Sequence, residues 1–183
     1  MKQQPAKQNG VTLIELIFVV CIIGIGAAFV TRMASAAVNA ARSSNSVAQL
    51  YASLTRARSF AASAGVDVVL CPSTDGTTCA PGYHWESGWI AFPAVHPGSN
   101  RKGDEPIIAL QKALPPKVHL ITSAGRTRVR FQPSGGNAGS NVTFTICDGR
   151  GERSAAAYAM ANNGSLHPAD GDQTYTLQAC TGI

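Results

Sequence analysis

A long apolar run near the N-terminus is the strongest pattern in the chain. Residues 11–30 read VTLIELIFVVCIIGIGAAFV, and Glu15 is the one charged residue among them. A helix of this length spans about 30 Å, which is the thickness of a bilayer core. A carboxylate inside such a segment is costly, so we expect Glu15 to have a function there; the alternative is that it is solvated near the lipid headgroups. The pattern predicts a membrane-spanning helix.

The helical pattern continues beyond the apolar run. Residues 31–64 contain neither Pro nor Gly and are rich in Ala, a strong helix former. Apolar residues then recur at spacings of three and four, which predicts one buried stripe: Val47, Leu50, Tyr51, Leu54, Ala57 and Ala61. Gly65 is a typical helix stop. We therefore predict one helix over about residues 12–64.

From residue 66 the pattern changes to short β-rich runs separated by turn residues. The predicted strands are Val66–Cys71, Trp89–Phe92, Ile107–Leu110, Val118–Thr122, Thr127–Phe131, Val142–Cys147, Ala155–Met160 and Thr174–Ala179. A long helix followed by strands predicts an α+β fold. We expect a mostly antiparallel sheet, or two small sheets, packed on the apolar face of the helix.

Composition narrows the class of protein. Of 183 residues, 45% are hydrophobic and 14% are charged, which excludes a disordered chain. At about 150 residues per domain, the length fits one globular domain with an appendage. The net charge of +5 is mildly basic and alone favours a polyanionic partner only weakly.

Motifs that carry enzymatic chemistry are missing from the sequence. It contains no H-E-x-x-H, G-x-S-x-G, P-loop or GxGxxG motif. Asp170 and Asp172 flank a glycine, but further ligands at EF-hand spacing are lacking, so we interpret this segment as a polar turn. We therefore expect a protein that is not an enzyme and that has no cofactor and no metal site.

Three interpretations of the apolar run compete. A secretory signal peptide would be cut near residues 34–36, ASA, although Glu15 would interrupt its apolar core. A plain membrane anchor leaves Glu15 unexplained. The third interpretation rests on the segment GVTLIEL, residues 10–16, and on the short polar leader MKQQPAKQNG that ends in it. Together they resemble the class III leader junction of type IV pilins and type II secretion pseudopilins, which is the interpretation we favour.

The resemblance implies a processing reaction and a role for the glutamate. In that family prepilin peptidase cuts after the glycine, here Gly10, and the new N-terminus, here Val11, is methylated. The family most often has Phe where this chain has Val11. The glutamate is the fifth residue after the cut, here Glu15. Because buried charges persist only when paired, we expect Glu15 to pair with the new amino group of a neighbouring subunit during filament assembly.

Later segments resemble the GspH/FimT/FimU subfamily: Trp89–Phe92 after Gly88, and Thr143–Cys147. The resemblance implies a type IV pilin-like fold with four parts: a leader peptide over residues 1–10, a transmembrane and assembly segment over 11–30, an amphipathic helix over 31–64 and a disulfide-stapled β domain over 65–183. It implies a minor pilin that primes or caps pilus assembly. The alternative is a minor pseudopilin of the type II secretion system, and the sequence does not separate the two.

The same resemblance implies a location and a set of partners. The chain would cross the bacterial inner membrane once, with the β domain in the periplasm, and would then enter a pilus or pseudopilus. The implied partners are prepilin peptidase, the inner membrane, and other minor and major pilins or pseudopilins.

Four of the five cysteines lie outside the apolar run. They allow three pairings. We favour Cys71 with Cys79, which closes a short loop, and Cys147 with Cys180, which would tie the last predicted strand to a central one. Their spacing does not fit a C-x-x-C metal or redox pair. Disulfides indicate an oxidising compartment, which agrees with a periplasmic domain.

Arginines alternate with other residues over residues 125–131, GRTRVRF. On a strand, Arg126, Arg128 and Arg130 would share one face at a spacing of about 7 Å, a repeat that suits a nucleic-acid backbone. The segment GRTR also reads as the GRxR motif that is associated with DNA binding in FimT-type minor pilins of naturally competent bacteria. DNA, bound without sequence preference, is therefore a candidate further partner. The alternative is an edge strand that charge protects from aggregation.

Overall fold

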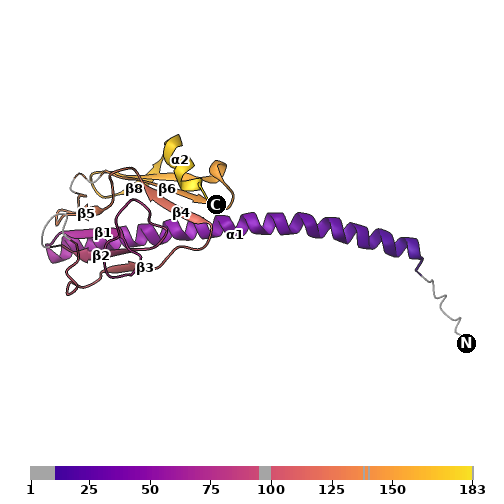
Figure 1. Cartoon of the computed structure of the whole chain (residues 1–183), viewed down its shortest axis with the longest axis horizontal. Helices are drawn as coiled ribbons and strands as arrows, with labels where there is room; N and C mark the ends of the chain where they lie inside the picture. The colour runs from indigo at the N-terminus through magenta and orange to yellow at the C-terminus, as the bar shows by residue number, and fades with distance from the viewer. Residues whose placement is uncertain (1–10, 95–99, 138, 140, 183) are drawn as a thin grey trace, which may run out of the picture. The chain divides into compact units, whose positions relative to one another are not determined.

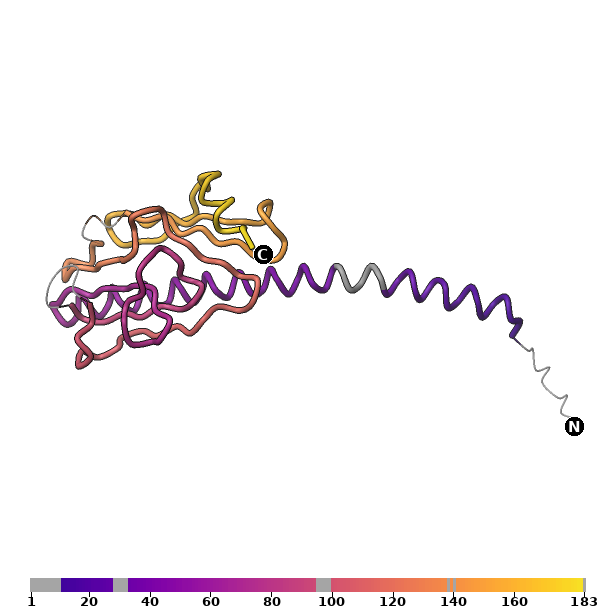
Figure 2. Tube along the Cα trace, in the orientation of Figure 1, coloured from indigo at the N-terminus to yellow at the C-terminus, as the bar shows by residue number. Residues whose placement is uncertain are grey.

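The computed structural model describes residues 11–94, 100–137, 139 and 141–182, and of residues 28–32 it describes the backbone only. The chain divides into two compact units, Met1–Ala37 and Val38–Ile183. The leader expected over residues 1–10, including Gly10, lies outside the described residues. Helix α1, Leu13–Ala64, has 52 residues and contributes to both units (Figures 1 and 2).

Helix α1 begins and ends close to the residues that the sequence predicts. Its last turn closes with a hydrogen bond from the Gly65 N–H to the Ala61 carbonyl at 3.1 Å. Gly65 has a φ of +68°, in the left-handed region that favours glycine, so the chain leaves the helix there. Within the second unit, the buried stripe of α1 comprises Leu50, Leu54, Ala57 and Ala61.

The first sheet contains β1 (Val68–Pro72), β2 (Trp89–Pro93), β3 (Ala109–Gln111) and β5 (Val129–Phe131), in the spatial order β3-β2-β1-β5. All three pairings are antiparallel. Strand β1 is central, and its Leu70 lies opposite Ala91 on one side and Val129 on the other. The short strand β5 therefore forms one edge of this sheet.

The second sheet contains β4 (Val118–Thr122), β6 (Thr143–Asp148), β7 (Ala156–Met160) and β8 (Leu166–Ala169), in the order β4-β6-β7-β8. It is also antiparallel throughout. A short 3-10 helix, η1 (Glu152–Ser154), lies between β6 and β7, and helix α2 (Gln173–Cys180) follows β8 (Figure 1).

One core joins both sheets to α1. The buried stripe of the helix packs in the same cluster as Leu70 and Trp89 of the first sheet and Phe144 of the second. The Trp85 ring meets the Phe144 ring edge-on, with ring centroids 5.3 Å apart. The structure thus confirms the predicted α+β fold, in the form of two small sheets that share one helix.

One prediction about the C-terminal part is wrong, and one strand there was not predicted. Thr174–Ala179 is not a strand, because it lies within helix α2. The Asp172 side chain caps that helix by accepting hydrogen bonds from the N–H groups of Thr174 and Tyr175. Strand β8 was not predicted because Pro168 interrupts it; as the edge of its sheet, it tolerates a residue without an N–H.

The structure contains the disulfides Cys71–Cys79 and Cys147–Cys180. The second one ties α2 to β6, so it fastens a helix, and not a last strand, to the sheet. The loop closed by the first is organised around Asp75. Its carboxylate accepts hydrogen bonds from the N–H groups of Thr78 and Thr77 and from the Thr78 hydroxyl, and these hold the Asp75 pKa well below its usual range.

Candidate functional site

The first turn of α1 is capped by a side chain that the sequence analysis overlooked. Thr12 immediately precedes the helix, and its Oγ1 accepts a hydrogen bond from the Glu15 N–H at 3.4 Å. Its carbonyl accepts from the Leu16 N–H at 3.2 Å. A Thr followed three residues later by Glu is the capping-box signature. Val11 thus immediately precedes the capping residue, and Glu15 lies in the first turn of the helix, where a negative charge interacts favourably with the helix dipole.

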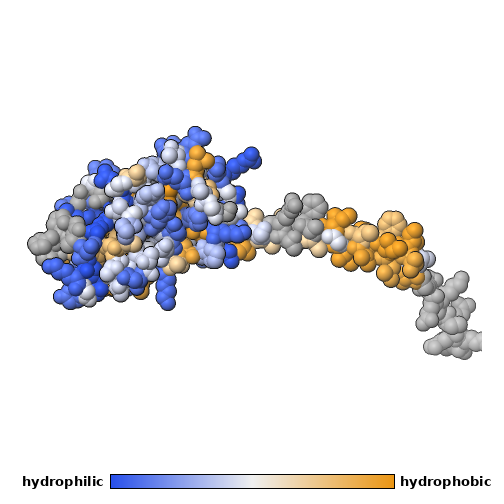
Figure 3. All heavy atoms as spheres, viewed as in Figure 1, coloured by the Kyte–Doolittle hydropathy of each residue, from blue (hydrophilic) through white to orange (hydrophobic). Residues whose placement is uncertain are grey.

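The side chains that the structure describes in the first unit are exposed on every side of the helix. Residues 11–27 are all exposed, with Leu13 at 81% and Phe18 at 64% of their full accessible area. Figure 3 shows hydrophobic residues covering this part of the chain. No salt bridge to Glu15 forms within the described residues. A helix that is apolar all round requires burial by something outside this unit.

Among the described residues, no helix has both the length and the apolar character needed to cross a membrane. The side chains of the last three residues in the expected membrane segment, 28–30, lie outside the described residues.

The arginine segment differs from the predicted strand. Strand β5 begins at Val129, so Arg126 and Arg128 lie before it and only Arg130 lies within it. The prediction of a strand from Thr127 is therefore wrong at its start, because the chain there turns back from β4 before pairing begins. Val129 and Phe131 are buried, so the inward alternation holds for the three residues of β5.

The three arginines have different surroundings. Arg130 donates from Nε and Nη2 to the same carboxylate oxygen of Asp67, both at 2.8 Å. Arg128 donates from Nη2 to the side-chain oxygen of Asn100. Arg126 is exposed, and its guanidinium forms no ion pair within the described part of the chain. Arg130 is thus already neutralised, and Arg126 is the most accessible charge of the set.

Contacts from distant elements hold the turn that carries Arg126. The Thr122 hydroxyl donates to the Arg126 carbonyl at 2.6 Å, and its oxygen accepts from the buried Trp85 indole N–H at 3.2 Å. On the outer side, the Ala124 N–H donates to the Tyr175 hydroxyl of α2 at 3.0 Å. Sequence reasoning missed these contacts because Tyr175 is 51 residues from Ala124 and was assigned to a strand.

A buried charge lies where β6 ends beside α1. Asp148 is fully buried, and Arg150 donates two side-chain hydrogen bonds to it, at 2.9 and 2.7 Å. Burial acts to raise the Asp148 pKa, but the hydrogen bonds from the Arg150 side chain and backbone, its charge, and a hydrogen bond from Ser43 together lower it. The same pairing raises the pKa of Arg150. Because Ser43 belongs to α1, this carboxylate links the second sheet to the helix.

Comparison with known families identifies the family to which the chain belongs. The family described as type II transport protein GspH matches residues 46–164. The chain belongs to the GspH family. The prokaryotic N-terminal methylation motif matches residues 5–31, which include Gly10, Val11 and Glu15. The resemblance drawn from the leader junction and the later segments is thereby confirmed at the level of the family.

Solved structures of one minor pilin share the fold of this GspH-family chain. Two crystal forms of the type IV minor pilin FimU of Pseudomonas aeruginosa (strain PAO1) match at 16% and 14% identity, with TM-scores of 0.53 and 0.55. They cover 69% and 75% of this chain and 92% of each FimU chain. The minor pseudopilin EpsH of Vibrio cholerae matches at 15% identity and a TM-score of 0.48, over 70% of this chain and 96% of EpsH. No curated protein sequence matches the chain. The fold is type IV pilin-like.

Proposed function

We propose that this GspH-family protein is a minor type IV pilin that primes or caps the assembly of a pilus. It acts as a structural subunit and not as an enzyme. Residues 11–30 hold it in the bacterial inner membrane, with the β domain in the periplasm, until it enters the filament. The observation that supports this is Glu15, a carboxylate that forms no ion pair within the described residues and lies in the capped first turn of a helix whose apolar residues 11–27 are exposed.

The position of Glu15 explains how subunits join. Prepilin peptidase, cutting after Gly10, releases the amino group of Val11 four positions before Glu15. In an apolar surrounding, an isolated carboxylate and an isolated ammonium are each strongly unfavourable, but a pair is tolerated. A subunit that places its Glu15 against the Val11 amino group of a neighbour satisfies both charges. The need to pair these two charges fixes the axial register of one subunit's helix against that of the next.

The test replaces Glu15 in the full chain in its native host. We expect Glu15→Ala and Glu15→Gln to be cut after Gly10 and to remain in the membrane, but to fall out of isolated filaments. Glu152→Ala, which removes an exposed carboxylate of η1, is the matched control and should be incorporated normally. Incorporation of both Glu15 variants at the wild-type level would overturn the proposal.

Cleavage after Gly10 and methylation of Val11 can be measured separately from assembly. Mass spectrometry of the N-terminus should find a chain that begins at methylated Val11. Substituting Gly10 with a bulky residue should leave the full-length chain in the membrane. An N-terminus at another residue would contradict cleavage at the expected junction.

A minor pseudopilin of the type II secretion system is the second candidate. The family name, type II transport protein, favours it. Deleting the gene separates the two candidates. Loss of twitching or of transformation supports the pilus, whereas loss of exoprotein secretion supports the secretion system.

We also propose that DNA binds without sequence preference at Arg126, Arg128 and Arg130. The exposed guanidinium of Arg126, on a turn held by Thr122 and Tyr175, favours this role. A fixed turn presents its charge without the entropy cost of ordering a loop. Affinity should fall steeply with salt, as for any contact that depends on phosphates.

A further inference from the structure

Two adjoining hollows lie along one side of α1 within the second unit. The first has a volume of about 490 Å³ and is lined by Val47 and Tyr51 of the helix, Tyr158 of β7, and Leu166 and Pro168 of β8, together with small residues of α1. Tyr51 is 55% exposed although it belongs to the helix face beside the sheet. Large apolar side chains thus line a hollow that no described residue fills.

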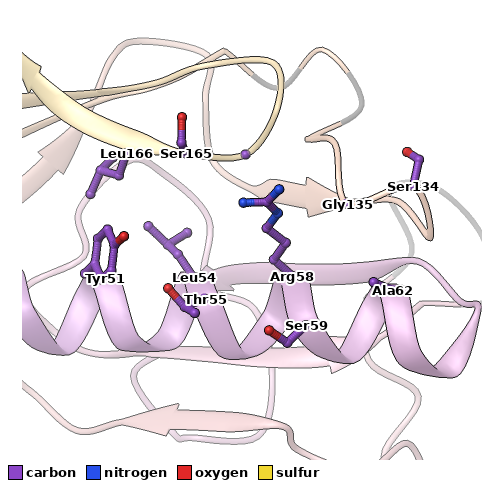
Figure 4. A pocket seen from close by; sticks show the side chains of 11 residues that line it. Tyr51, Leu54, Thr55, Arg58, Ser59, Ala62, Ser134, Gly135, Ser165 and Leu166 are labelled. Carbon is purple, nitrogen blue, oxygen red and sulfur yellow. The ribbon is translucent and has the colours of Figure 1, made fainter.

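The second hollow has a volume of about 340 Å³ and carries a positive charge. It lies between α1 and the turns that contain Gly135 and Gly164. Figure 4 shows Tyr51, Leu54 and Arg58 projecting from α1 toward the segment of Ser165 and Leu166. Arg58 forms no ion pair with any described residue. An exposed guanidinium therefore points into a hollow that supplies it with no carboxylate.

Tyr51 and Leu166 line both hollows, which makes them one continuous α1–β8 groove. The groove follows α1 from Ser44 to Ala62, a length of about 27 Å at 1.5 Å per residue. The two ends of the groove differ in chemistry. The end near Ser44 is apolar, whereas the end near Ala62 carries Arg58 among hydroxyl groups. An occupant that matches it is apolar along most of its length and acidic at one end.

We propose that the α1–β8 groove is the docking site for an acidic neighbouring subunit in the filament, one that inserts apolar side chains beside Tyr51 and Leu166 and presents a carboxylate to Arg58. This inference rests on the proposed function, because it names the partner of an assembly subunit. The net charge of the chain favours a different subunit, and not a second copy, as the occupant of the groove. Cleavage after Gly10 removes Lys2 and Lys7 and leaves 13 Lys and Arg against 10 Asp and Glu, so each copy in the filament carries a net charge of +3 and two copies repel on close approach.

The first experiment asks what occupies the groove. Benzoylphenylalanine replaces Tyr51 in the full chain in the native host, and filaments are irradiated. The matched control carries the same group at Leu110 of β3, which is 54% exposed and does not line the groove. We expect position 51, and not position 110, to crosslink to another pilin-like subunit whose crosslinked segment contains an Asp or Glu. A homodimer, a lipid adduct or no adduct at position 51 overturns the proposal.

The second experiment tests the charge. Arg56 is the matched control for Arg58, because both are exposed on α1 but only Arg58 lines the groove. We expect Arg58→Glu to lower incorporation about tenfold or more, and Arg56→Glu to have little effect. Reversing the crosslinked acidic residue of the partner to Lys should restore incorporation of Arg58→Glu. Equal effects of the two arginine variants, or no rescue, overturn the proposal.

The two proposals fail in different ways. If Arg58→Glu is incorporated normally while Glu15→Ala is not, the protein is an assembly subunit and the groove is not its docking site. If Glu15→Ala is also incorporated normally, the proposed function itself is wrong. Protease resistance of the Arg58→Glu chain in the membrane, compared with wild type, verifies that the variant is folded.

Discussion

The Tyr175 hydroxyl of α2 accepts a hydrogen bond from the Ala124 N–H, across 51 residues of sequence and at 3.0 Å. This contact joins the C-terminal helix to the turn that carries Arg126. The Tyr175 ring packs against a small cluster of Ile121, Cys147 and Ala179, so ring and hydroxyl have separable roles.

Tyr175→Phe should keep the ring packing and remove the hydrogen bond. We expect a loss of about 0.5–1.5 kcal/mol in the free energy of unfolding, measured by denaturant titration, and faster hydrogen exchange at the Ala124 amide. Tyr158→Phe is the control, because the Tyr158 hydroxyl forms no hydrogen bond within the described residues. Unchanged exchange at Ala124 would show that the bond does not hold the turn.

The two disulfides should contribute unequally to stability. Cys147 and Cys180 are 33 residues apart, whereas Cys71 and Cys79 are 8 apart. In the chain-entropy account, closing the longer loop restricts the unfolded chain more, by about 1 kcal/mol. We expect the double Ser variant of the longer loop to be the less stable of the two by about that amount. Equal unfolding free energies would indicate that the Asp75 loop contributes folded-state interactions of its own.

Gly88 cannot be replaced without displacing backbone. It has a φ of +111°, and a Cβ there would lie 2.5 Å from the Gln111 carbonyl oxygen. Gly82 has a similar φ of +97°, but a Cβ there would meet nothing within 4 Å. Gly82→Ala should therefore cost about 1–3 kcal/mol from backbone strain alone. Gly88→Ala should cost more, and comparable thermal midpoints for the two variants would contradict the clash.

If the arginine segment binds DNA, its three arginines should contribute unequally to the salt dependence of the affinity. For the full chain in detergent, we expect Arg126→Gln to reduce the slope of log K against log salt by about 0.9, the loss of one phosphate contact. Arg130→Gln should change the slope less, because Asp67 already neutralises Arg130. Arg153→Gln, an exposed arginine of η1, is the control. Equal slopes for wild type and Arg126→Gln would remove Arg126 from the contact.

Asp148 should make stability fall in acid. Its pKa in the folded protein is lowered from the ordinary 3.8, so its contribution is fully present above that value and is lost as the pH falls through the lower, folded pKa. Asp148→Asn should be less stable at neutral pH by about 1–3 kcal/mol, because Arg150 and Ser43 lose a charged acceptor. Its unfolding free energy should then fall less steeply than that of wild type as the pH falls below 3.8. Parallel pH profiles would contradict this role.

Elements set by local sequence were predictable, and those set by distant contacts were not. Helix α1 could be predicted because its Ala-rich second half lacks Pro and Gly and ends at Gly65. The β-branched residues Thr174 and Thr176 favoured a strand, but β propensity is weak against the cap that Asp172 supplies to α2. The arginines were visible as a pattern, yet the pairing of Arg130 with Asp67 joins residues 63 apart. No periodicity in the sequence reports such a contact.

The edge strands of the two sheets determine whether two chains of this protein can pair strand to strand. Strands β3 and β5, which border the first sheet, have three residues each, and β8 contains Pro168. The remaining edge strand, β4, is bridged by His84 opposite Ile121. Short, interrupted or covered edges are poor templates for pairing with another chain. Pairing of these edges with another chain is therefore disfavoured, so contacts with other subunits are expected to be made by side chains.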